Sequence, residues 1–219
     1  IMPKIIKEQL KPIHQELIDM LGKLIPCIEG RYIMSDGALL GLIRDGGFIS
    51  HDDDIDIYLL PDSSINLEKL KSKGLDLQKY YLCDKIYNPK KQKYKSPNRW
   101  REFLSYTITL PEYQGLNRFE LIAESSKIYG EQYIEPEFSL PNIDIFYLEE
   151  WNNEYYLPYY YPNKYGYSEL VYDKDMIYYA PLRDFHGVMV RIPHNPIRVL
   201  RMIYGLNWWI PERDKSFIK

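Results

Sequence analysis

Residues 33–60 read IMSDGALLGLIRDGGFISHDDDIDIYLL, and within them the pattern changes from strand-like to helical and back to strand-like. The apolar residues before Ser35 suit a short strand, and the Asp-Gly pair after it suits a sharp turn. The helical spacing that follows is broken by glycines, after which acidic and apolar residues alternate. The pattern predicts, in order, a strand at 31–34, a turn at 35–37, a short helix that holds Leu39, Leu40 and Ile43, a break at 45–47 and a strand at 54–60.

The strand predicted at 54–60 begins with alternating carboxylates. Successive side chains of a strand point to opposite faces, so Asp54, Asp56 and Tyr58 share one face. The isoleucines between them point the other way, into the expected core. Two carboxylates on one face repel each other without a cation, and they are well placed to bind one hard divalent ion. Asp52 continues the alternation if the strand starts early.

The acidic run has two other interpretations. A solvated acidic turn is disfavoured by the apolar residues that interleave with the acids. A calcium-binding loop that begins at Asp52 needs Gly at its sixth position and Glu at its twelfth, where the chain has Ile57 and Ser63. The calcium loop is therefore excluded, and a divalent cation bound at the strand is favoured.

A second apolar strand, predicted at 142–148, carries one acid, Asp144. An unpaired carboxylate in such a strand is costly unless it is paired or binds a metal. One interpretation is an edge strand whose Asp144 faces water. The functional interpretation makes Asp144 a third acid that converges on Asp54 and Asp56 from a neighbouring strand.

Glycines flank the short helix that follows the first predicted strand. A glycine turn such as Gly37 that opens a helix offers backbone N–H groups and a positive dipole end to a phosphate, and Gly41 lies one turn further on. The order of strand, glycine turn, helix and Asp-x-Asp strand is typical of a nucleotidyltransferase-type active site.

The flanking segments predict, in chain order, a helix at 3–24, a helix near 64–73, strand-like pieces at 79–83, 106–110 and 118–123, a loop with short strands at 151–180, a strand at 187–192 and a helix from Pro196 to Tyr204.

The composition is that of a folded globular domain. The chain has 219 residues, of which 45% are hydrophobic and 27% charged, and this excludes disordered, collagen-like and coiled-coil proteins. A net charge of -3 disfavours a nucleic-acid partner, which would usually need a more basic surface. No apolar stretch is long enough to predict a transmembrane segment. Cys27 and Cys83 are expected to be buried thiols, with a single disulfide bridge as the alternative.

Ser35–Ile57 resembles the signature of the LicD family, which includes bacterial phosphocholine transferases and animal fukutin and fukutin-related proteins. Ile143–Phe146 resembles the later Asp strand of that family. The C-terminal part of this chain also resembles the end of the family's sequence. The residues that resemble it are Val190-Arg191-Ile192-Pro193, Leu200, Tyr204, Gly205, Trp208 and Pro211. We therefore expect a single α+β domain over residues 1–219, with core motifs at 30–60, 140–150 and 182–212 and with 61–139 poorly assigned.

The resemblance implies a nucleotidyltransferase-like mixed sheet flanked by helices. It also implies metal-dependent transfer of a phospho-alcohol group, phosphocholine or a polyol phosphate, from a CDP-linked donor to a glycan hydroxyl. One alternative is a nucleotidyltransferase that releases pyrophosphate. The other is an inactive scaffold in a glycosylation complex, which the complete set of three acids argues against.

The resemblance also assigns site residues. Asp54 and Asp56 are implied as catalytic ligands of Mg²⁺ or Mn²⁺, and Asp144 as either a third ligand or the base that accepts the acceptor's proton. Ala38 stands where the family usually has a hydroxyl residue, and His51 where it usually has Trp. Instead of binding the donor, Arg44 has an alternative role as a cation at the C-terminus of the helix. The alternative for His51 is that it is an ordinary loop residue. The residues expected to bind the donor are Gly37, Ala38, Gly41, Arg44 and His51.

Overall fold

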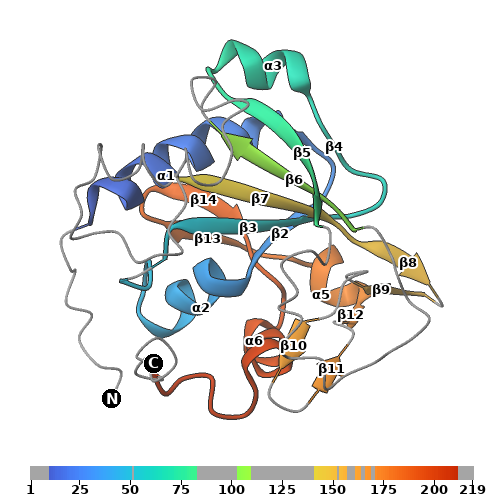
Figure 1. The fold of residues 1–219 in the computed structure, drawn as a ribbon. Coiled ribbons are helices and arrows are strands. Elements are labelled where there is room, and N and C mark those ends of the chain that lie inside the picture. The colour runs from blue at the N-terminus through green and yellow to red at the C-terminus, as the bar shows by residue number, and fades with distance from the viewer. Residues whose placement is uncertain are drawn as a thin grey trace, which may run out of the picture.

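The computed structural model describes residues 10–50, 52–82, 103–109, 141–151, 153–156, 161–163, 166–168 and 171–211. A five-stranded mixed sheet forms the centre of the molecule, with β3 and β7 parallel and all other neighbours antiparallel (Figure 1). In spatial order its strands are β2 (Tyr32–Ser35), β3 (Asp54–Leu59), β7 (Asn142–Tyr147), β6 (Phe103–Thr109) and β5 (Asp76–Leu82). The predicted α+β class is confirmed.

Helices and smaller strand pairs surround this sheet. The helices are α1 (Pro12–Leu24), the 3₁₀ turn η1 (Ile25–Cys27), α2 (Asp36–Arg44), α3 (Leu67–Ser72), α5 (Lys174–Tyr178) and α6 (Pro196–Tyr204). The smaller strands are β1 (Ile28–Glu29) with β4 (Ser64–Ile65), β8 (Glu149–Trp151) with β9 (Glu154–Tyr156) and β12 (Val171–Asp173), β10 (Tyr161–Asn163) with β11 (Gly166–Ser168), and β13 (Leu182–Phe185) with β14 (Val188–Arg191).

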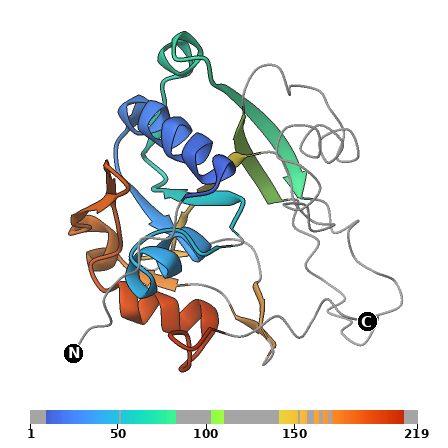
Figure 2. The same cartoon turned by 90° about the vertical axis from the view of Figure 1, so that its left-hand side faces the viewer.

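The two sides of β3 are covered by different helices. In Figures 1 and 2, α1 lies on one side of β3, while α2 and α6 lie on the other. Helix α1 buries the apolar stripe Leu17, Met20, Leu21 and Leu24 completely, because these residues recur at helical spacing and face the sheet. Helix α2 contacts β2, β3 and α6. The acidic end of β3 therefore lies beside α2.

Helix α6 has the bounds that its sequence predicts. The Asn195 side chain accepts a hydrogen bond from the backbone N–H of Arg198 at 3.1 Å, and Pro196 takes the first helical position. Gly205 ends the helix with a φ of 84°, a conformation that glycine adopts without steric cost.

Other predicted elements differ from the structure. Helix α1 begins at Pro12, after residues 10 and 11, which are not helical, since proline has no N–H for an interior helical bond and suits a first turn. Helix α3 is shorter than 64–73 because Ser64–Ile65 forms β4. The strand predicted at 187–192 is half of a hairpin, in which His186 and Gly187 both have positive φ values of 52° and 93°. The predicted strand at 118–123, residues 3–9 and Cys83 lie outside the described residues, whereas Cys27 is buried as expected.

Two glycines in helices offer a matched test of packing. A Cβ at Gly41 in α2 would lie 2.2 Å from the carbonyl oxygen of Gly47 and 2.9 Å from the backbone nitrogen of Ile49. At Gly22 in α1 it would lie 3.6 Å from a Val188 methyl group, an ordinary contact. We expect Gly41→Ala to destabilise the protein by about 1–3 kcal/mol because backbone atoms must move. Gly22→Ala should stabilise it by up to about 1 kcal/mol in urea unfolding, and equal effects would contradict this packing.

Candidate active site

Three carboxylates converge at the end of β3. In the parallel register of β3 and β7, Asp54 lies opposite Asn142, and Asp56 lies opposite Asp144. Residues of neighbouring strands that are paired in register present their side chains on the same face. One carboxylate oxygen from each of Asp54, Asp56 and Asp144 lies within 4.8 Å of the other two. The structure thus brings together the three acids that the sequence pattern selected.

Burial and mutual repulsion make these acids hard to ionise without a cation. Burial is the largest cause that raises the pKa values of Asp54 and Asp56 well above the usual range for aspartate. Neighbouring negative charges raise them further, and for both residues Asp144 and Asp36 are among those neighbours. A cation shared by the three carboxylates would offset both effects.

Asp36 is a further acid at this site that the sequence patterns did not select. It opens α2 with a φ of 48°, and its side chain is only 3% exposed. The Tyr58 hydroxyl, on the same face of β3 as the acidic pair, donates a hydrogen bond to the Asp36 carboxylate. Its signal in the sequence is weak, because an Asp-Gly pair after a strand reads first as a turn.

Asp52 lies against the first turn of α2. A Cβ built on Gly37 would be 2.9 Å and 3.0 Å from the two carboxylate oxygens of Asp52, so only glycine leaves room for this approach. A carboxylate is favoured there by the positive end of the helix dipole. Burial is the main cause that raises the pKa of Asp52 to about 7. The predicted glycine turn therefore faces a side chain of the protein itself.

We expect Gly37→Ala to separate stability from metal binding. The new methyl group must displace the Asp52 carboxylate, which neighbours Asp54 and Asp56 electrostatically. Displacing a group next to metal ligands typically weakens metal affinity about 10- to 100-fold. The same close contact offsets the gain in helix propensity that alanine brings, so the free energy of unfolding should change by less than about 1 kcal/mol. Calorimetric titration with Mn²⁺ and thermal unfolding measure the two effects, and an unchanged Mn²⁺ affinity would contradict this geometry.

An aromatic stack fixes the loop that leads into the acids. The Phe48 ring lies between His14, at 4.4 Å between centroids, and His186, at 5.5 Å, and is nearly parallel to both. His14 Nε2 donates to the carbonyl oxygen of Asp52 at 3.0 Å, and Phe48 N–H donates to His186 Nε2 at 3.3 Å. Burial lowers the pKa of His14, which favours its neutral form. The stack joins three distant segments, so no local sequence pattern could reveal it.

The predicted donor-binding residues lie in different surroundings. Arg44 donates two hydrogen bonds to Asp45, at 2.8 Å and 2.6 Å, and is electrostatically coupled to Asp52. Ala38 is 1% exposed and packs in the core. Gly41 is buried against the loop at Gly47–Ile49. His51 lies outside the described residues, and donor binding by all these residues stays a prediction.

Tyr204 brings α6 to the edge of the site. Although the residue is 40% exposed overall, desolvation of its hydroxyl and the negative charges of Asp36 and Asp56 raise its pKa above the usual range of tyrosine. The same tyrosine interacts electrostatically with Arg44. The Tyr204 hydroxyl therefore stays protonated and able to donate a hydrogen bond near the acids.

The donor atoms suit a hard divalent cation. Carboxylate oxygens are the ligands that Mg²⁺ and Mn²⁺ prefer, and three of them lie close enough to share one ion. Two buried polar atoms nearby, Ser35 Oγ and Asp52 Oδ2, have no hydrogen-bond partner among the residues that the structure describes. Ser35 lies opposite Asp56 in the register of β2 and β3. A bound ion with its water ligands would satisfy such atoms.

Comparison with protein families finds a match over residues 29–107. The matching family is described as "LicD/FKTN/FKRP, nucleotidyltransferase domain". The matched range contains β2, α2 and β3, and therefore Asp54 and Asp56. A comparison with curated proteins finds no match. In the described part of the chain, no helix combines the length and apolar character needed to span a bilayer.

Proposed function

The match over residues 29–107 supports membership of this chain in the LicD family, and from it we propose a metal-dependent phosphotransferase. The transferred unit is a phospho-alcohol group, phosphocholine or a polyol phosphate. Its donor is a CDP-linked alcohol and its acceptor a glycan hydroxyl. The observation that carries the proposal is the convergence of Asp54, Asp56 and Asp144 within 4.8 Å beside the N-terminus of α2.

The reaction replaces the phosphoanhydride linkage of the donor with a phosphodiester linkage to the acceptor. The acceptor oxygen attacks the phosphorus that carries the alcohol and forms a new P–O bond. The bond from that phosphorus to the bridging oxygen of the pyrophosphate breaks, and CMP leaves with the bonding electrons. The proton of the acceptor hydroxyl passes to a base. Charge on the pyrophosphate must be neutralised for this displacement to proceed.

The residues of this chain divide these tasks. Asp54 and Asp56 would hold the divalent cation, which supplies positive charge at the phosphates. Asp144 completes the set, either as a third ligand or as the base that takes the acceptor's proton. Arg44, which is paired with Asp45 at the C-terminal end of α2, would exchange this partner for a donor phosphate. The protonated Tyr204 hydroxyl would donate to the same group.

A panel of CDP-choline, CDP-ribitol and CDP-glycerol with Mn²⁺ and a mixture of glycan acceptors tests the proposal. We expect metal-dependent, acceptor-dependent release of CMP from at least one donor. A parallel reaction with CTP and phosphocholine detects the nucleotidyltransferase alternative, because that reaction releases pyrophosphate. Pyrophosphate without CMP would replace the proposed reaction, and neither product from the panel would favour the inactive scaffold.

A further inference from the structure

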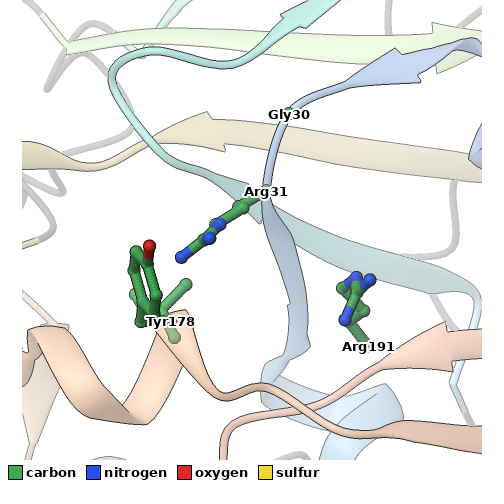
Figure 3. Close-up of a pocket in the computed structure, with 5 residues that line it drawn as sticks. Gly30, Arg31, Tyr178 and Arg191 are labelled. Atoms are coloured by element: carbon green, nitrogen blue, oxygen red, sulfur yellow. The ribbon is translucent and has the colours of Figure 1, made fainter.

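A second site lies at the other end of β2 from the acids. A cavity of about 290 Å³ opens there, and the described residues that line it are Gly30, Arg31, Ile177, Tyr178 and Arg191 (Figure 3). They come from the entry to β2, from α5 and from β14. Two of these five residues are arginines, and none is acidic.

Arg31 is held in place by an aromatic ring and by its own backbone. Its guanidinium carbon lies 3.3 Å from the centroid of the Tyr178 ring, toward which the side chain points in Figure 3. Its backbone N–H donates to Ser63 Oγ at 2.8 Å, and its carbonyl accepts from the same hydroxyl. The position of Arg31 is thus fixed without use of the hydrogen-bonding capacity of its guanidinium.

That capacity is unused within the described part of the chain. The guanidinium of Arg31 donates no hydrogen bond to any described residue, and its Nη1 is buried. A guanidinium carries five N–H donors, and a buried donor without an acceptor is costly. An oxygen-rich ligand in the cavity would supply acceptors to the guanidinium nitrogens other than the buried Nη1.

Arg191 adds a second positive charge to the same cavity. One of its nitrogens donates to the Ala180 carbonyl at 3.0 Å, which orients the group. Among the residues that the structure describes, neither Arg31 nor Arg191 forms an ion pair. Two uncompensated guanidiniums on one small cavity favour a dianion over a monoanion or a neutral ligand.

The cavity is distinct from the acidic site. Arg31 directly precedes β2, whereas Ser35, the register partner of Asp56, ends it. Four residues of extended chain span roughly 13 Å. A ligand in this cavity therefore does not share the cation at Asp54, Asp56 and Asp144.

We propose that this cavity binds an organic phosphate of about the size of a sugar phosphate. A phosphate dianion matches the two guanidiniums in charge, and guanidinium groups bind phosphate oxygens through paired hydrogen bonds. The volume lies at the lower end of the range of ligand pockets, roughly 300–1,000 Å³, so it suits a monosaccharide better than a nucleotide.

Calorimetric titration of the metal-free protein with glucose 6-phosphate, in low-salt buffer without phosphate, tests this assignment. We expect saturable binding to the wild type and to Asp54→Asn, since the acids take no part. Glucose should not bind measurably. Arg31→Ala and Arg191→Ala should each weaken binding about tenfold or more, because each removes charge-assisted hydrogen bonds. Arg183→Ala, which removes an exposed arginine of the neighbouring strand β13, is the matched control and should bind as the wild type does.

Arg31→Lys and Arg191→Lys keep the positive charge but lack the planar guanidinium group. These two variants replace the alanine variants in the test if an alanine variant does not fold. Each should bind more weakly than the wild type. Absence of binding to the wild type, equal binding of glucose, or wild-type affinity in both the Arg31 and Arg191 variants would overturn the assignment. None of these outcomes depends on CMP release, so the result is separate from the proposed transferase activity.

Discussion

Asp56→Asn should lower the rate of CMP release from the active CDP-alcohol by about a thousandfold or more. Asp56 lies in register with both Ser35 and Asp144 and is one of the three converging carboxylates. Its loss removes a negatively charged ligand from the proposed cation, and metal catalysis of this kind contributes several kcal/mol to transition-state stabilisation, with each ~1.4 kcal/mol changing the rate tenfold. Steady-state assays at saturating Mn²⁺ measure the loss.

Asp62→Asn is the matched control for this substitution. Asp62 follows β3 and is exposed, so the same chemical change there should leave the rate within about twofold of the wild type, as surface substitutions away from such sites have small effects. Asp56→Asn with more than a tenth of wild-type activity would show that the acids are not the catalytic metal site.

The second large effect is on stability, and it follows from the crowding of carboxylates. Mn²⁺ with CDP binds only the folded protein, so at about 100 times the dissociation constant it should add ~2.7 kcal/mol. For a chain of this length that corresponds to a rise in melting temperature of roughly 5–10 °C. Asp54→Asn should remove most of this rise. Without metal, the same variant should be at least as stable as the wild type, because it relieves repulsion among buried acids.

The pH dependence of the metal-free protein tests the same crowding. The pKa of Asp52 is raised from 3.8 to about 7, and those of Asp54 and Asp56 are also raised, so the folded state binds protons that the unfolded state has released. The contribution of these groups to stability is therefore present below about pH 4 and falls as the pH rises toward 7 and above. The urea midpoint of Asp54→Asn should exceed that of the wild type by more at pH 7 than at pH 5. A difference that shrinks as pH rises would contradict this origin.

The local patterns of the sequence predicted the parts of the fold that local chemistry determines. Alternation of acids and isoleucines identified β3, and a single acid in an apolar strand identified Asp144 in β7. The structure then placed Asp144 beside Asp56, a pairing that strand patterns alone leave open because they do not set the order of strands. Helix α6 was predicted to the residue because Asn195 and Gly205 are strong capping residues.

The remaining features depend on contacts between distant segments. Ile57 and Tyr58 point to opposite faces of β3, yet both are fully buried, because helices cover the two sides. The alternation of acidic and apolar residues in the sequence predicted that only the isoleucine face of this strand lies in the core. The stack of His14, Phe48 and His186 likewise joins α1, the loop before β3 and the β13–β14 turn. Such contacts come from tertiary packing, which overrides local preference.

The cavity at Arg31 is another feature that depends on contacts between distant segments. Arg31, Tyr178 and Arg191 lie far apart in the sequence; Arg31 and Tyr178 stood out by no local pattern, and Arg191 appeared only within the segment that resembles the C-terminal end of the LicD family. An arginine beside a strand reads as a solvated charge until its neighbours are known. The absence of a compensating acid among the described residues is visible only in three dimensions.

Direct titration of the wild type and Asp144→Asn with Mn²⁺, followed by the electron paramagnetic resonance signal of the free ion, tests the metal centre itself. Asp144 is the decisive position because it reaches the other two acids from a different strand, within 4.8 Å. We expect the wild type to bind one ion per chain, Asp62→Asn to bind equally well, and Asp144→Asn to bind about tenfold or more weakly, as expected when a metal site loses a charged oxygen ligand. A wild-type protein that binds no Mn²⁺, or an Asp144→Asn protein with wild-type affinity, would contradict the three-carboxylate metal site.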